Sequence, residues 1–220
     1  MAQSLDLEEQ EQLDQIKHFW KRYGNLITWV LLAASVSFAA WNGWQFWQHK
    51  QASGAAVLFD EIERAVADKD ATRMERTLTD MKAQFGSTVY AQQGALLAAH
   101  GLSAAGDAPK ARQALEWAAG QNKDEGLQAI ARLRLAGLLM ENGTPEEAKK
   151  SLEATMPTAF EGLLADRQGD LHLRAGQSDQ ARQAYLKAYQ LLADTTEYRR
   201  LVEIKLNALG VDPTPAAAKS

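Results

Sequence analysis

Residues 106–115 read GDAPKARQAL, and the same pattern returns as GTPEEAKKSL at residues 143–152 and as GQSDQARQAY at residues 176–185. In each copy a Gly ends one helix, because a left-handed backbone conformation costs Gly little. A polar or proline-containing turn then begins a second helix, which carries Ala and, four residues later, Leu or Tyr on one face. The pattern therefore predicts three helical hairpins in succession.

The helix before each turn carries a small residue seven positions ahead of the Gly, namely Ala99, Ala136 and Gly169. Small side chains at this position let the two helices of a hairpin approach closely. A degenerate copy precedes them, with Lys69 at the turn and Ile62 seven positions before it. The sequence therefore predicts about four helix pairs.

The C-terminal end of the chain departs from the repeat. Residues 196–209 predict a solvent-facing capping helix that ends at Gly210, as the last repeat of a stack requires. Residues 211–220 predict a disordered tail.

A period near 34 residues, with small residues at the tight contact and Gly at the turn, resembles tetratricopeptide repeats. The resemblance is partial, because the aromatic residue early in the first helix is missing and the closing Pro is absent or displaced, as at Pro157. Alternation typical of strands is almost absent, so the predicted fold is all-α: a tetratricopeptide-like α-solenoid that follows one transmembrane helix. An irregular bundle of Ala-rich hairpins is the alternative.

The transmembrane prediction rests on the uncharged stretch from Tyr23 to His49. About 20 helical residues cross a hydrocarbon core of roughly 30 Å. Trp20 marks one end of the stretch and Trp47 the other, as aromatic side chains do at membrane interfaces. A cleaved signal peptide is the alternative, but its basic region is short, whereas some two dozen residues with five acidic side chains precede this stretch.

Basic residues near the stretch predict its orientation. Lys17, Lys21 and Arg22 precede it, and Lys50 alone follows it closely, so the N-terminus should be cytoplasmic. The predicted parts are a cytoplasmic tail (1–23), a transmembrane helix (24–48), a periplasmic domain (49–210) and the disordered tail (211–220), which places the protein in a bacterial inner membrane.

Composition excludes several functions. Beyond residue 22 the chain holds 23 acidic and 21 basic side chains, a net charge of −2, which offers no basic field for nucleic acid. The absence of Cys excludes disulfides and Cys metal sites. Asp170 and His172 stand two apart and point away from each other on a helix, which argues against a metal site. No phosphate loop or nucleophile motif occurs, so we expect neither an enzyme nor a cofactor.

Function is then expected on surfaces. In stacked hairpins the first helices line a concave groove. The residue after each small contact and its neighbours one turn away predict a partner-binding groove formed by Leu96, His100, Leu133, Met140, Glu141, Asp166, Asp170, Leu173 and Arg174, with Ser103 or Ala104 and Gly137 beside them. The alternative is that several of these side chains pack between repeats.

A second surface is predicted on the membrane helix. Ser35, Ala39 and Gly43 recur every four residues and form a stripe on which another helix can approach closely in lipid. Small residues are frequent in any membrane helix, so this spacing also arises without a partner.

The segments FWKRYGN (19–25) and WNGWQFW (41–47) enter and leave the predicted span. With the acidic N-terminus, the repeats and the cap, they resemble the ancillary SecYEG translocon subunit family of Gram-negative bacteria over nearly the whole chain. The resemblance implies association with the SecYEG channel, cooperation with a membrane-anchored periplasmic chaperone of the prolyl-isomerase type, and help for exported client proteins. It also implies restraint of an envelope-stress response regulator in the cytoplasm. The runner-up is a tetratricopeptide scaffold for envelope assembly or division that makes no translocon contact.

Overall fold

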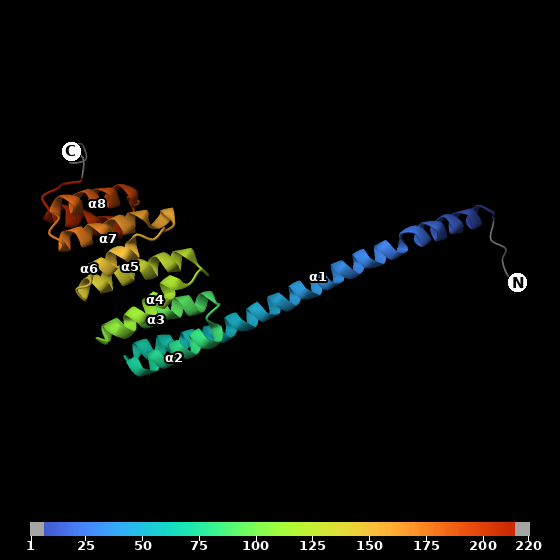
Figure 1. The fold of residues 1–220 in the computed structure, drawn as a ribbon, viewed down its shortest axis with the longest axis horizontal. Coiled ribbons are helices and arrows are strands. Elements are labelled where there is room, and N and C mark those ends of the chain that lie inside the picture. The colour runs from blue at the N-terminus through green and yellow to red at the C-terminus, as the bar shows by residue number, and fades with distance from the viewer. Residues whose placement is uncertain (1–6, 214–220) are drawn as a thin grey trace. The chain divides into compact units, whose positions relative to one another are not determined.

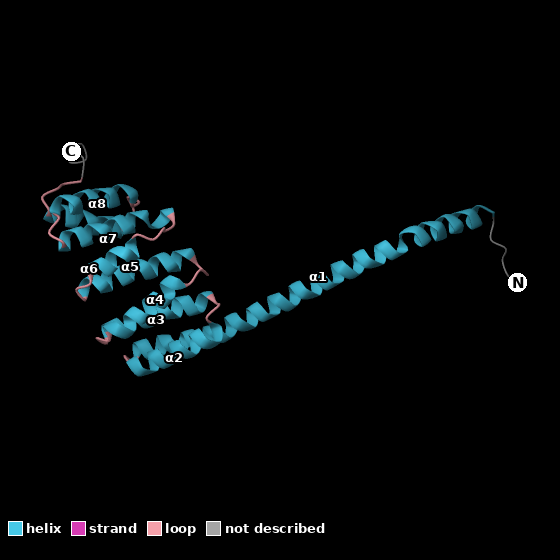
Figure 2. Cartoon of the chain, in the orientation of Figure 1, coloured by secondary structure: helices cyan, strands magenta, loops and turns pink. Residues whose placement is uncertain are grey.

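The computed structural model describes residues 7–213, and in this range the chain forms only helices and their connections (Figure 2). The predicted all-α fold is confirmed. Two compact units meet at the Gln51–Ala52 bond, and helix α1 (Leu7–Ala67) begins in the first and ends in the second. Residues 1–6 of the predicted cytoplasmic tail and residues 214–220 of the predicted disordered tail lie outside the described residues.

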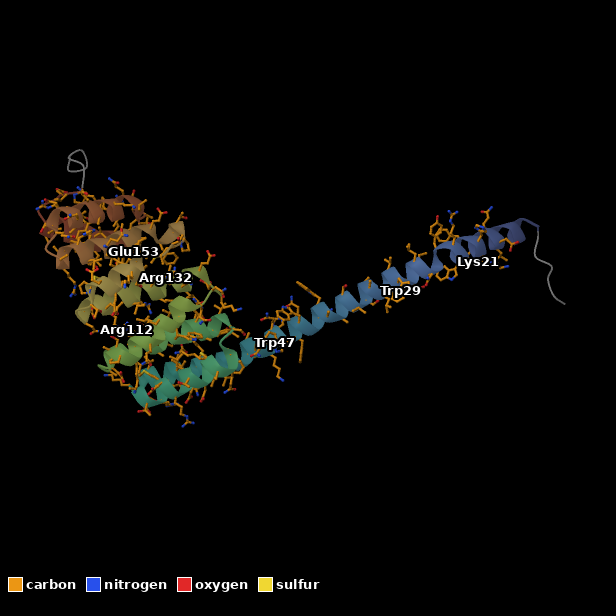
Figure 3. All side chains as sticks on the ribbon, in the orientation of Figure 1. Lys21, Trp29, Trp47, Arg112, Arg132 and Glu153 are labelled. Carbon is orange, nitrogen blue, oxygen red and sulfur yellow. The ribbon has the colours of Figure 1, made fainter. Side chains whose placement is uncertain are left out.

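The first unit consists of α1 residues whose apolar side chains are exposed. Trp29 is 64% and Phe38 71% exposed, and the side chains of Trp29 and Trp47 project away from the helix (Figure 3). The hydroxyls of Thr28 and Ser37 each donate to the carbonyl four residues earlier at 2.8 Å, so their polar groups are satisfied within the helix. By length and composition this helix can cross a membrane.

The second unit contains the rest of the repeat helices, which follow one another side by side in chain order (Figure 1). They are α2 (Ala71–Phe85), α3 (Val89–Ala104), α4 (Ala108–Gly120), α5 (Glu125–Glu141), α6 (Pro145–Leu152), the 3-10 turn η1 (Thr158–Phe160), α7 (Glu161–Arg174), α8 (Ser178–Leu191) and α9 (Glu197–Ala208). The last turns of α1 pair with α2, where Arg73 Nε lies 2.7 Å from Glu61 Oε1. The pairs α3/α4, α5/α6 and α7/α8 follow, and α9 packs on α8 as the cap.

The hairpin turns share one backbone geometry. Gly106, Gly143 and Gly176 have φ of +82°, +77° and +73°, and Gly210 ends the cap at +77°. At the first of them, Asp107 N–H donates to the Leu102 carbonyl at 2.9 Å and Gly106 N–H to the Ser103 carbonyl at 3.0 Å. These two hydrogen bonds satisfy carbonyl groups that would otherwise lack partners at the end of the helix. The turn positions read from the sequence are therefore confirmed.

Lys69 holds the same position in the first hairpin with φ +57°, the only positive φ of a non-Gly residue among the described residues. Its Cβ disfavours this conformation by about 1–2 kcal/mol. We therefore expect Lys69→Gly to raise the free energy of unfolding by about 1 kcal/mol, measured by thermal or urea unfolding. As a control, Lys150→Gly inside α6 should lower it by about 0.5–1 kcal/mol. A Lys69→Gly protein less stable than the parent would contradict this expectation.

Small residues bring the helices of each pair together. Ala99 and Ala136 are buried, and the Tyr185 ring lies so close to Gly169 that a Cβ there would come within 2.4 Å of its Cε1. Ala148 on α6 is likewise fully buried. The small contacts predicted within the hairpins are therefore present.

Ion pairs connect the second helices of successive hairpins. Lys110 on α4 lies 2.8 Å from Glu75 on α2, and Arg112 on α4 lies 2.7 Å from Glu147 on α6. The hydrogen bond with Glu75 raises the pKa of Lys110. These side chains are substantially exposed, so the ion pairs contribute little to the stability of the domain. They show that α2, α4 and α6 lie next to one another in chain order.

The buried hydrophobic side chains form two clusters. The first runs from Ile62 at the end of α1 to Leu152 on α6. The second joins Ala165 of α7 to side chains of α8 and α9, including Tyr185 and Val202. Helix α7 contributes to both, because its Leu171 packs against the first cluster.

Candidate functional site

A pocket of about 320 Å³ opens on the first helices of three successive hairpins. We call it the first-helix pocket, and its polar lining consists of His100 and Ser103 from α3, Arg134 and Glu141 from α5, and Arg167 from α7. Gly137 lies among them on α5 and exposes backbone rather than a side chain. The stacking of α3, α5 and α7 thus brings together His100 and Arg167, which are 67 positions apart in the chain.

Two guanidinium groups dominate this pocket. Arg167 extends across Gly137, where an added Cβ would lie 3.7 Å from its Nη1, and the same Nη1 donates to Asp170 at 3.1 Å. Its Nε is buried and has no hydrogen-bond partner. Arg134 donates to the Leu96 carbonyl at 3.4 Å and forms no ion pair within residues 7–213.

A larger cleft of about 660 Å³ lies beside the turns of the third and fourth hairpins. We call it the turn-side cleft, and its lining includes Met140, Lys149, Glu153, Leu171, His172 and Arg174. Arg174 donates to the Met140 carbonyl at 3.0 Å, and His172 Nδ1 lies 2.7 Å from Gln177 Oε1. Polar groups of the cleft are thus partly used to hold α7 against α5 and α8.

Asp166 and Asp170 take part in a buried polar cluster under the cap. Asp166 is fully buried and accepts from Lys205 Nζ at 2.8 and 2.9 Å and from the Tyr198 hydroxyl at 2.7 Å. Asp170 accepts from Lys205 at 2.7 Å and from the Tyr185 hydroxyl at 2.8 Å. Burial, and then the neighbouring carboxylates, raises the pKa of both tyrosines. The cluster fastens α9 to α7.

The predicted groove residues do not share one surface. His100 and Glu141, with Ser103 and Gly137, line the first-helix pocket, whereas Met140 and Arg174 line the turn-side cleft. Leu96, Leu133 and Met140 are at most 7% exposed and belong to the first hydrophobic cluster. Leu173 is 42% exposed. A role in partner binding stays a prediction for all of them.

Sequence reasoning missed Arg134 and Arg167. Each stands two positions before a small contact, Ala136 or Gly169. The rule used to predict the groove took the residue after that contact and the residues four positions from it, so it left both arginines out. Arg134 nevertheless lies three positions before Gly137 and seven before Glu141, on the same face of α5, which lines the pocket. A search for basic residues within one turn of the small contacts Ala136 and Gly169 would have found both.

The predicted membrane-helix stripe is exposed in the structure. Ser35, Ala39 and Gly43 are all exposed, and a Cβ added at Gly43 would meet no atom within 4 Å. Its use as a helix contact stays a prediction.

Comparison with protein families finds that residues 17–211 match the tetratricopeptide repeat-like domain. The chain belongs to this family. The match includes the apolar part of α1 together with all of the hairpins, so the membrane segment and the repeats belong to one family pattern. This agrees with the turn geometry and the stacking order described above.

Curated relatives carry one name. The protein named ancillary SecYEG translocon subunit in Neisseria gonorrhoeae is 28% identical to this chain over 207 residues, which cover 92% of this chain and 98% of the relative. The protein of the same name in Aggregatibacter actinomycetemcomitans is 26% identical, and the match covers 92% of this chain and 98% of that relative. The Escherichia coli protein of that name is 21% identical, covering 92% and 97%. No solved structure matches. The family resemblance read from the sequence is confirmed.

Within residues 7–213, no three His, Cys, Asp or Glu side chains lie close enough together to hold a metal ion. The first-helix pocket and the turn-side cleft each present guanidinium, imidazole and carboxylate groups beside apolar side chains. Such linings suit non-covalent recognition of another protein.

Proposed function

We propose that this protein is an ancillary subunit of the SecYEG translocon that acts as a non-catalytic, membrane-anchored adaptor. The observation that carries the proposal is the similarity to proteins of that name over 92% of the chain. The exposed apolar side chains of α1 supply the anchor, and the hairpins supply surfaces for protein partners. The fold alone equally suits a scaffold without translocon contact, and the homologues' names favour the translocon.

We propose that the repeat domain lies in the periplasm. Lys17, Lys21 and Arg22 precede the span, so the N-terminal side should stay in the cytoplasm of the inner-membrane protein. The domain would then meet exported polypeptides and a membrane-anchored prolyl-isomerase-type chaperone. Restraint of a cytoplasmic stress regulator would fall to the residues before the span, because only they would face the cytoplasm.

Topology can be tested with reporters. An alkaline phosphatase fused after Ser220 should be active, because that enzyme matures only in the periplasm, and the same reporter fused near Met1 should be inactive. Replacing Lys17, Lys21 and Arg22 by Gln should weaken this bias, with Lys50→Gln as the matched control. The reverse activity pattern in the parent protein would overturn the orientation.

Translocon association can be tested by photo-crosslinking in native membranes. A crosslinking amino acid at Ala39 should capture a channel subunit if the small-residue stripe forms the contact. The matched control is Ser37, which points to the other side of the helix. If crosslinks from the span and from the domain recover no channel subunit, the translocon proposal fails and the general scaffold becomes the better account.

A further inference from the structure

The part of α1 that directly precedes the membrane span has two unlike faces. On a helix of 3.6 residues per turn, the large apolar side chains of residues 13–23 fall within an arc of about 120°. We call this arc the juxtamembrane face, and it consists of Leu13, Ile16, Phe19, Trp20 and Tyr23. The rest of the circumference is polar and carries Asp14, Gln15, Lys17, His18, Lys21 and Arg22. Residues 13–23 are therefore strongly amphipathic.

The juxtamembrane face is exposed and continues into the span. Ile16 is 65% and Trp20 61% exposed. The rings of Phe19 and Tyr23 have centroids 5.1 Å apart, and the Trp20 ring lies over Gly24, 3.2 Å from the position that a Cβ would take there. The aromatic side chains thus form one apolar surface that runs without interruption to the first residues of the span.

A helix that continued straight out of the bilayer would leave half of this face in water. Ile16 stands ten positions before Leu26, where the apolar run begins, which corresponds to about 15 Å along a helix. The headgroup layer on each side of a bilayer is only about 5–8 Å thick. The bilayer therefore covers Leu13 and Ile16 only if residues 13–23 lie along its surface.

Gly24 allows the helix to turn at the edge of the span. Glycine inside a helix carries no side chain that stiffens the backbone. The Thr28 hydroxyl donates to the Gly24 carbonyl at 2.8 Å, and a bond of this kind to the preceding turn favours bending of a helix.

The charges of this segment suit a phospholipid surface. Residues 13–23 carry three basic side chains and one acidic side chain, a net charge of +2. Lys17 and Lys21 stand one turn apart beside the juxtamembrane face, where their stems can follow the apolar surface while the ammonium groups reach lipid phosphates. Residues 8–11 hold three acidic side chains, so the surface-lying stretch ends at Leu13.

We propose that residues 13–23 form an interfacial helix whose juxtamembrane face is embedded in the headgroup layer at the N-terminal end of the span, with α1 bending at Gly24. Such a helix enters the bilayer by about 5–10 Å. The occupant of the apolar face is therefore the phospholipid surface. This inference goes beyond the proposed function and requires of it only the membrane span. In the orientation proposed above, only the polar face with His18 and Arg22 stays open to a cytoplasmic partner.

The chain contains no Cys, so a single introduced Cys carries a nitroxide label to one chosen position. The test uses the full-length protein in nanodiscs of phosphatidylethanolamine and phosphatidylglycerol, with labels on Ile16→Cys and on its exposed neighbour, Gln15→Cys. Collisions with an aqueous nickel chelate should be about tenfold fewer at position 16 than at position 15, and collisions with oxygen should be more frequent. Leu31→Cys gives the value for the span and Lys150→Cys the value for water.

Charge variants test whether the apolar face holds the segment. With the label kept at position 16, Phe19→Asp should raise collisions with the nickel chelate at least about threefold, because it places a carboxylate on the embedded face. Gln15→Asp adds the same charge to the polar face and should leave them unchanged.

Three outcomes would overturn the inference. Equal nickel collisions at positions 15 and 16 would show a helix that rises straight into water. Equal effects of the two Asp variants would remove the role of the apolar face. Protection of position 16 from both nickel and oxygen, with spin–spin broadening between labels, would assign the face to a second copy of the chain. The nanodiscs contain no channel, so each of these failures leaves the translocon proposal standing.

Discussion

Removal of residues 1–51 is expected to release the protein from membranes and to lower its recovery with SecYEG about 100-fold, while leaving the repeat domain folded. Every buried hydrophobic side chain in the described part of the chain lies after Gln51, beginning with Ala55. The domain therefore keeps its core without the anchor, but loses the local concentration that the membrane helix provides. Sedimentation of membranes and co-purification with the channel measure the loss, and circular dichroism reports the fold.

An unrelated single membrane helix fused to residues 52–220 is the control. Recovery of channel association in this chimera would assign the contact to the repeat domain, and continued loss would assign it to α1 and its small-residue stripe. A soluble fragment that remained bound to the channel at the parent level would contradict the anchoring role.

Lys205→Met is expected to destabilise the domain by about 3–5 kcal/mol, because it leaves the fully buried Asp166 without its cation. The same change removes the Lys205 contact with Asp170, so two carboxylates lose their shared partner. Methionine preserves most of the side-chain volume, so the effect measures charge rather than packing. Urea unfolding of the full-length protein in detergent gives the change in free energy.

Lys187→Met provides the matched control, because Lys187 is an exposed lysine on α8. A surface substitution of this kind should change stability by no more than about 0.5 kcal/mol. Equal unfolding midpoints for the two variants would show that the polar cluster under the cap contributes little.

The hairpins were predictable because their turns have a strong local cause. A Gly or a tolerated substitute must adopt positive φ where a helix ends, and the turns at Gly106, Gly143 and Gly176 repeat with their small contacts. The turn at Lys69 was also predicted, because the residues around it kept the spacing of the repeat. The cap was predictable for the same reason, since Gly210 stops α9.

The pockets were not predictable to the same degree, because they depend on side chains from different hairpins. Asp166 was expected in the groove, yet it is fully buried under Lys205, which lies 39 residues away in sequence. Periodicity places a residue on a face of its own helix, but it does not say which later helix covers that face. Arg134 and Arg167 line the first-helix pocket from positions three before the predicted groove residues Gly137 and Asp170, a spacing that a rule of four-residue steps left out.

The division of the buried side chains into two clusters joined through α7 bears on how the domain opens. Each stacked repeat is stabilised mainly by its contacts with its neighbours, so separate hydrophobic clusters open as separate cooperative units. Backbone amides of α8 and α9, which surround the second cluster, should therefore exchange with deuterium as one group, and those of α3 to α5 as another. A partner that spans α5 and α7 would merge the two groups into one, so protection against deuterium exchange becomes a direct readout of binding.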